Sequence, residues 1–245
     1  MMRSSRRDKA TVLRSLLGEI EAACVDTVLM SAEHLSSRFS ATHIQELAAD
    51  FSNYDCLIAV VVRDHVSRAL SAYSTSIASG RHLTLDDFVN EICHPHNNYI
   101  RYRETITQWE AIFGEKNIIV ISYNDKDIIT VLAKNLISLD ISSRRNDYYD
   151  KNKSIAAPLL ESDRLANEAA AKYRWRVKSK FNPLAIAARI RHAMTRNAIE
   201  SSQGRLRLDE EQFRRVNEIA DIDRRWLADH YHVQLENFRS DGDAP

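Results

Sequence analysis

The stretch that decides the fold is Leu57-Ile-Ala-Val-Val-Val-Arg63-Asp-His-Val-Ser-Arg-Ala-Leu-Ser71-Ala-Tyr73. Its apolar, mostly β-branched beginning predicts a short buried strand over residues 56–62. A helical pattern follows almost at once, over residues 66–79. Because a buried strand that turns directly into a helix is the first half of a βαβ unit, we expect an α/β fold.

Two more apolar runs predict strands, at residues 25–30 and 117–123. Helical patterns lie around them, at residues 11–23, 42–50 and 99–113, and Gly114 is a natural end for the last of these. Strands that alternate with helices pair in parallel through crossover connections. We therefore expect a parallel sheet covered by helices on both faces, with ligands bound beyond the C-terminal ends of its strands.

The pattern changes after about residue 150. No further strong strand is visible, and helices are predicted at residues 158–177, 183–200 and 209–230. The chain contains only 5 glycines and 4 prolines, and no stretch has the composition of a linker. We expect one domain over residues 1–245, with a sheet-containing part at about 1–150 and a helical C-terminal part at about 151–240.

Composition narrows the function classes. The 34 Lys and Arg residues balance the 34 Asp and Glu residues, so no overall field attracts nucleic acid, and we expect no nucleic-acid partner. The three cysteines lack a C-x-x-C spacing, which favours a reducing compartment and predicts a cytoplasmic protein. No apolar run has the length of a transmembrane segment. The run Cys93-His94-Pro-His96 lacks the four ligands of a zinc site, and we expect no metal.

The residue pair Arg63 and Ser71 can bind a phosphate. Arg63 stands at the end of the predicted strand, and Ser71 follows eight residues later on the predicted helix. A guanidinium offers a planar fork of donors to a dianion, and a hydroxyl can add another donor. The structural alternative is a salt bridge from Arg63 to the helix, with Ser71 facing solvent. The residue pattern leaves both interpretations open.

Residues 60–73 resemble the 3′-phosphate-binding segment of the sulfotransferase family. The resemblance implies a P-loop NTPase-like sulfotransferase fold, PAPS (3′-phosphoadenosine 5′-phosphosulfate) as co-substrate, PAP as product, and Arg63 and Ser71 as ligands of the 3′-phosphate. Residues 99–123 are similar to the helix, turn and strand that follow in this family, which implies that Tyr123 lies near the adenine. The alternative for Tyr123 is an aromatic side chain that closes the end of the sheet.

The same resemblance implies a catalytic base in the segment after the first predicted strand, where this chain has Glu33 and His34. Sulfuryl transfer to a hydroxyl or amine requires a base within hydrogen-bonding reach of the acceptor proton. Neighbouring residues that leave a strand point to opposite sides, so we expect only one of the two to serve. The alternative is a polar strand end or a helix cap.

One element of the family pattern has no counterpart in the sequence. Family members hold the 5′-phosphosulfate with a loop of the K-T-G-T-T kind, whereas residues 1–7 contain no glycine and Gly18 lies inside a helical pattern. Two hypotheses follow: a sulfotransferase that acts when this loop is supplied, or a truncated or degenerate PAP-binding domain without catalysis. A P-loop kinase, the third class, would need a G-x-x-x-x-G-K-[ST] segment, which is absent.

A basic stretch covers residues 172–207, with ten Lys and Arg residues against Glu200 alone. Such charge runs are typical of a solvated helix face. The alternative is a surface for an anionic acceptor such as a glycan or an acidic lipid. The expected partners are therefore PAPS and PAP, with a carbohydrate as one candidate acceptor.

Overall fold

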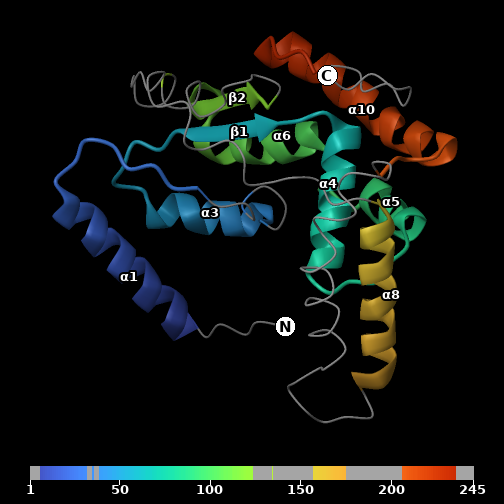
Figure 1. The fold of residues 1–245 in the computed structure, drawn as a ribbon. Coiled ribbons are helices and arrows are strands. Elements are labelled where there is room, and N and C mark those ends of the chain that lie inside the picture. The colour runs from blue at the N-terminus through green and yellow to red at the C-terminus, as the bar shows by residue number, and fades with distance from the viewer. Residues whose placement is uncertain are drawn as a thin grey trace.

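The computed structural model describes residues 6–31, 35, 39–123, 134, 157–174 and 206–235 of the 245-residue chain. Its elements are, in chain order, α1 (Arg6–Ala23), α3 (Ala41–Asp50), β1 (Ile58–Val62), α4 (His65–Ala78), α5 (Leu85–Cys93), α6 (Tyr102–Phe113), the 3-10 helix η1 (Glu115–Asn117), β2 (Ile118–Ser122), α8 (Ala157–Arg174) and α10 (Glu210–Tyr231) (Figure 1). None of the helices in this part of the chain is both long and apolar enough to cross a membrane.

β1 and β2 form a parallel pair. Ile58 lies opposite Ile118 and Val62 lies opposite Ser122, and the N–H of Tyr123 donates to the carbonyl of Val62 at 2.7 Å. Both strands begin close to their predicted first residues, and the helices between them make the crossover that a parallel pair requires. The prediction of an α/β fold with a parallel sheet is therefore confirmed.

One face of this sheet carries the first hydrophobic core. Side chains alternate between the faces of a strand, and Ile58, Val60, Val62, Ile118 and Val120 all point to the face that packs on α6. Trp109 and Ile106 of α6 receive them, and α3 packs on the other side of α6 (Figure 1). The opposite face carries the buried Ile121 and the half-buried Ala59, Val61 and Ile119, which join none of the clusters formed by described residues. Within these residues the expected helical cover is present on one face.

A second core joins helices from both parts of the chain. It contains buried side chains of α4, α5, α8 and α10, namely Ala69, Tyr73, Ile77, Phe88, Ile92, Leu160 and Ile219. Figure 1 shows α8 alongside α4, and the two helices are in direct contact. The C-terminal helices therefore pack against the helix that leaves β1.

The predicted strand at residues 25–30 is wrong. The segment has no regular secondary structure, and Val25, Leu29 and Met30 are exposed. β-branched and apolar residues favour a strand only where a neighbouring strand and a packing surface receive them, and the described residues provide neither for this segment. The predicted helix at residues 183–200 lies outside the described residues.

α5 was not predicted from the sequence, although its signals are present. The hydroxyl of Thr84 accepts a hydrogen bond from the N–H of Asp87, as an N-cap does, and two aspartates occupy the first turn. Phe88, Val89 and Ile92 then form its buried side. With only nine residues, the helix is too short for its apolar period to stand out.

A buried carboxylate ties three helices together. Asp223 of α10 is 1% exposed, and its Oδ2 accepts from Nε2 of His65 at 2.8 Å and from the N–H of Tyr102 at 2.7 Å. Its Oδ1 accepts from the N–H of Arg103 at 3.1 Å. The N-cap residue of α6, Arg101, makes no side-chain cap, so Asp223 caps α6 from another helix.

Replacing this carboxylate will destabilise the fold. We expect Asp223→Ala to lower the free energy of unfolding by about 3–5 kcal/mol, because two backbone N–H groups and a buried imidazole lose their acceptor. Urea unfolding followed by circular dichroism measures the change. Asp221→Ala is the matched control on the same helix: that exposed carboxylate pairs with the half-buried Arg224, which keeps its hydrogen bond to Asn217, and its loss should cost only a small fraction as much. Equal losses from the two variants would contradict the capping role of Asp223.

Candidate functional site

Arg63 and Tyr123 meet at the C-terminal edge of the sheet. Arg63 directly follows β1 and Tyr123 directly follows β2, so parallel pairing brings the two residues to the same edge. The guanidinium carbon of Arg63 lies 5.0 Å from the centre of the Tyr123 ring, in a cation–π contact. Tyr123 is 50% exposed. Two of the residues singled out from the sequence are thus in contact.

The backbone of Arg63 is held by the phenol of Tyr102 on α6. The N–H of Arg63 donates to the phenol oxygen at 2.8 Å, and the phenol donates to the carbonyl of Arg63, also at 2.8 Å. Nη1 of Arg68 donates to the same oxygen at 3.2 Å. A phenol has one donor and two acceptor positions, so all of its hydrogen-bonding capacity is used.

Charged side chains at the start of α4 lie beside the two hydrogen bonds between Tyr102 and Arg63, which together we call the clamp. Asp64 is the N-cap, and its Oδ1 accepts from the N–H of Ser67 at 2.9 Å. The guanidinium of Arg68 lies 5.0 Å from the ring centre of Tyr99 and 4.8 Å from that of Tyr102. Oδ2 of Asp64 and Nε of Arg68 are buried without a hydrogen-bond partner within the described residues. The helix N-terminus therefore carries unused donors and acceptors beside Arg63.

Ser71 lies in the second turn of α4, and its side chain is exposed. Its carbonyl accepts from the hydroxyl of Thr75, while its own hydroxyl bonds to no described residue. An exposed hydroxyl agrees both with a phosphate ligand and with a serine that faces solvent, so the role of Ser71 stays a prediction. Glu33 and His34, the two candidate bases, lie outside the described residues.

Arg63 differs in its surroundings from three other half-buried arginines. Arg164, Arg215 and Arg224 each pair with a carboxylate. Arg63 and Arg68 have no carboxylate partner in the part of the chain that the structure describes, and the alternative of a salt bridge from Arg63 to the helix is not among the contacts there. Two partly desolvated cations beside a single buried carboxylate, Asp64, leave a net positive local charge. Such a site favours an anionic ligand.

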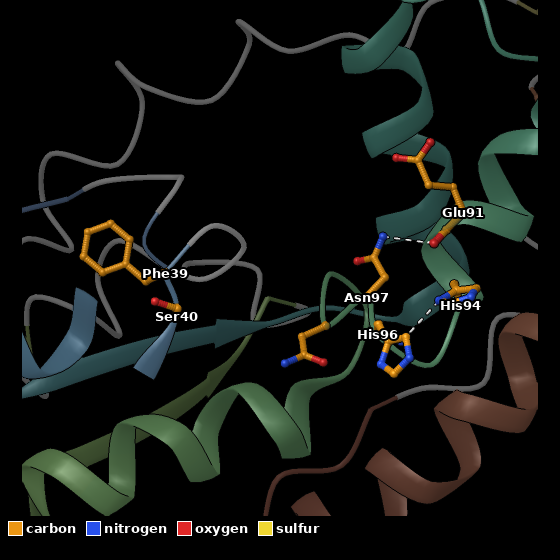
Figure 2. Close-up of a pocket in the computed structure, with 7 residues that line it drawn as sticks. Phe39, Ser40, Glu91, His94, His96 and Asn97 are labelled. Atoms are coloured by element: carbon orange, nitrogen blue, oxygen red, sulfur yellow. Dashed lines mark hydrogen bonds between the residues drawn. The ribbon is translucent and has the colours of Figure 1, made fainter. Parts of the chain in front are cut away.

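A second feature is an open cavity of about 560 Å³ between the start of α3 and the loop from α5 to α6. Figure 2 shows its lining residues, which are Phe39, Ser40, Glu91, His94, His96, Asn97 and Asn98. The carboxylate of Glu91 pairs with Arg81 at 2.6 Å, and the side chain of Asn97 donates to the carbonyl of Glu91 at 3.0 Å. The hydroxyl of Ser40 bonds to His43. The imidazoles of His94 and His96 and the amide of Asn98 remain, and these suit a neutral ligand that carries hydroxyl groups.

The two histidines of this loop, His94 and His96, contact each other. The rings of His94 and His96 lie 5.4 Å apart, and the N–H of His96 donates to Nδ1 of His94 at 3.3 Å. Among the described residues, no three or more His, Cys, Asp or Glu side chains come together in a way that could hold a metal ion.

Sequence reasoning missed Tyr102 and Asp223. Tyr102 lies within the predicted helix at residues 99–113, but nothing in the sequence pairs it with Arg63, 39 residues away. Asp223 carries a visible signal, since it stands in register with the buried Val216, Ile219, Ala220 and Leu227 of α10. A carboxylate on the apolar side of a helix needs a buried partner, which the sequence cannot name.

Comparisons with known proteins support a family assignment. The family model described as the sulfotransferase domain matches residues 7–136, just over half of the 245-residue chain. No curated protein and no solved structure shows significant similarity to the chain. The matched segment contains β1, α4, α6 and β2, and therefore both Arg63 and Tyr123.

The buried phenol makes stability sensitive to alkaline pH. Burial raises the pKa of Tyr102, although Arg68 nearby lowers it. Because its folded pKa lies above the usual value of about 10, Tyr102 contributes stability that is fully present below that pH and is lost as the pH rises through the folded pKa. Urea unfolding at a series of pH values from 7 upward should show a smaller alkaline loss of stability for Tyr102→Phe than for the wild type. If the free energy of unfolding had the same pH dependence in the variant and the wild type, burial would not be raising the pKa of Tyr102.

Proposed function

Because the chain belongs to the sulfotransferase domain family, we propose that it binds a 3′-phosphorylated adenosine nucleotide and transfers a sulfuryl group from PAPS to a hydroxyl or amine acceptor. The observation that carries this proposal is the contact of Arg63 with Tyr123 at the C-terminal sheet edge, where α/β folds bind ligands. The P-loop NTPase-like form of the fold belongs to the same proposal.

Arg63 and Ser71 are the proposed ligands of the 3′-phosphate. A half-buried guanidinium without a carboxylate partner in the described residues can give a bidentate pair of hydrogen bonds to a dianion. The exposed hydroxyl of Ser71, on the helix that begins beside Arg63, can add a further donor.

Tyr123 is the proposed neighbour of the adenine. One side of its ring carries the Arg63 guanidinium, and the ring is half exposed. An exposed aromatic face can stack on a purine. Because the Arg63 guanidinium lies against the same ring, the groups proposed to bind the adenine and the 3′-phosphate are in contact with each other.

The reaction needs one proton acceptor. The acceptor oxygen or nitrogen attacks the sulfur in line, the bond from sulfur to the bridging phosphate oxygen breaks, and PAP leaves. Glu33 or His34 is the proposed base that takes the acceptor proton. A carbohydrate is one candidate acceptor, and the amide and imidazole groups of the cavity beside α3 support hydroxyl binding. Free Cys24, Cys56 and Cys93 support a cytoplasmic, reducing setting for this chemistry.

The second candidate function is a truncated or degenerate PAP-binding domain that transfers nothing. The observation in its favour is that residues 1–245 contain no glycine-rich loop of the K-T-G-T-T kind to stabilise the sulfonate charge. Both candidates use the same nucleotide site, so nucleotide binding and sulfuryl transfer are tested separately.

Calorimetry with PAP and with adenosine 5′-phosphate tests the nucleotide site. We expect the wild type to prefer PAP, and Arg63→Ala to lose about 10- to 100-fold in PAP affinity because charge-assisted hydrogen bonds disappear. Ser71→Ala should lose about 3- to 10-fold. Affinity for adenosine 5′-phosphate should change little. Arg81→Ala, which removes an arginine paired with Glu91 at the surface, is the charge-matched control and should bind PAP as the wild type does. Equal wild-type affinities for both nucleotides would reject the 3′-phosphate site.

Transfer of labelled sulfonate from PAPS to a panel of sugars, alcohols and amines tests the enzyme. We expect either Glu33→Gln or His34→Gln to reduce kcat at least about 100-fold, because a general base is lost, with the dissociation constant for PAP unchanged. The other variant should stay close to the wild type. Selective PAP binding without transfer to any acceptor would favour the non-catalytic domain, and full activity in both variants would show that neither residue is the base.

A further inference from the structure

The two hydrogen bonds between Tyr102 and Arg63 fix a direction as well as a position. The N–H of Arg63 belongs to the peptide plane before its Cα, and its carbonyl belongs to the plane after it. Both groups lie 2.8 Å from one phenol oxygen. Linking both planes to a single atom restricts the two backbone dihedrals of Arg63 and so fixes the direction in which its side chain leaves the strand.

Tyr102 is itself immobilised. It is 2% exposed, its ring packs in an edge-on contact with His65 at 4.9 Å between ring centres, and Arg68 covers its face. Its own N–H is held by Asp223, which also accepts from His65. Asp223 belongs to α10, outside the 7–136 segment that the family model matches.

We propose that Tyr102 is a positioning residue for Arg63, and that Asp223 holds Tyr102 in place, so that selectivity for the 3′-phosphate depends on the C-terminal helix. The proposal rests on the proposed nucleotide site. An arginine whose backbone is already ordered loses less freedom when it binds a phosphate, and it presents its donors in one direction. Removing the phenol should therefore weaken the contribution of the 3′-phosphate and spare the rest of the nucleotide.

The test is the ratio of the affinities for PAP and adenosine 5′-phosphate in Tyr102→Phe. This change removes one oxygen and keeps the ring, its cation–π contact and the helix cap. We expect the ratio to fall about 3- to 10-fold, as for loss of hydrogen bonds, while affinity for adenosine 5′-phosphate stays unchanged. In an Arg63→Ala background the same change should alter PAP affinity less than about 2-fold, since the group that Tyr102 positions is absent.

Tyr73→Phe is the matched control. Tyr73 is 3% exposed, and its phenol donates to the carbonyl of Leu83 at 3.2 Å, in the second core. It should keep the wild-type ratio. An equal fall in Tyr73→Phe would show that any lost buried phenol acts through stability, and would overturn the proposal.

Hydrogen exchange of the Arg63 amide, followed by NMR, reports the clamp without any ligand. We expect exchange to be at least about 10-fold faster in Tyr102→Phe and in Asp223→Asn, and unchanged in Tyr73→Phe. A wild type that discriminates between the nucleotides, together with a Tyr102→Phe variant of unchanged ratio and exchange, would overturn the positioning role alone. A wild type that does not discriminate would overturn the nucleotide site and the positioning role with it.

Discussion

The buried carboxylate of Asp223 is the contact on which the arrangement of the helices depends. A charge that is 1% exposed is tolerable only when its hydrogen bonds replace those of water, and here an imidazole and two backbone N–H groups do so. The bonds come from α4 and α6, while the carboxylate comes from α10. Three helices that share few other polar contacts are thereby fixed at the C-terminal end of β1.

This contact explains why the candidate site is ordered despite a sheet of only two described strands. A two-stranded sheet has little stability of its own, so the orientation of its edge depends on the helices around it. α6 supports the sheet through its apolar side and clamps Arg63 through Tyr102. The resulting edge presents a cation and an aromatic ring to solvent, a combination suited to a phosphorylated purine.

The sequence was sufficient for the parts of the fold that depend on local pattern. β1, β2 and their parallel pairing follow from two apolar runs and the helix between them, and Gly114, at φ 84°, ends α6 as expected. The strand predicted at residues 25–30 was wrong because its composition is typical of a strand, whereas a strand also needs a neighbouring strand to pair with. Arg63 and Tyr123 were foreseeable from a family pattern. The hydrogen bonds of Tyr102 to Arg63 and of Asp223 to Tyr102 were not foreseeable, because they join residues that lie 39 and 121 positions apart.

The separation in sequence also sets an order of assembly. His65 and Tyr102 leave the ribosome long before Asp223, 158 and 121 residues later. A nascent chain can form α4 and α6 early, but the first turn of α6 keeps uncapped N–H groups until the C-terminal helix docks. The sheet edge that holds Arg63 is therefore completed last, and a chain interrupted before α10 would carry every residue of that edge without the contacts that fix the backbone of Arg63.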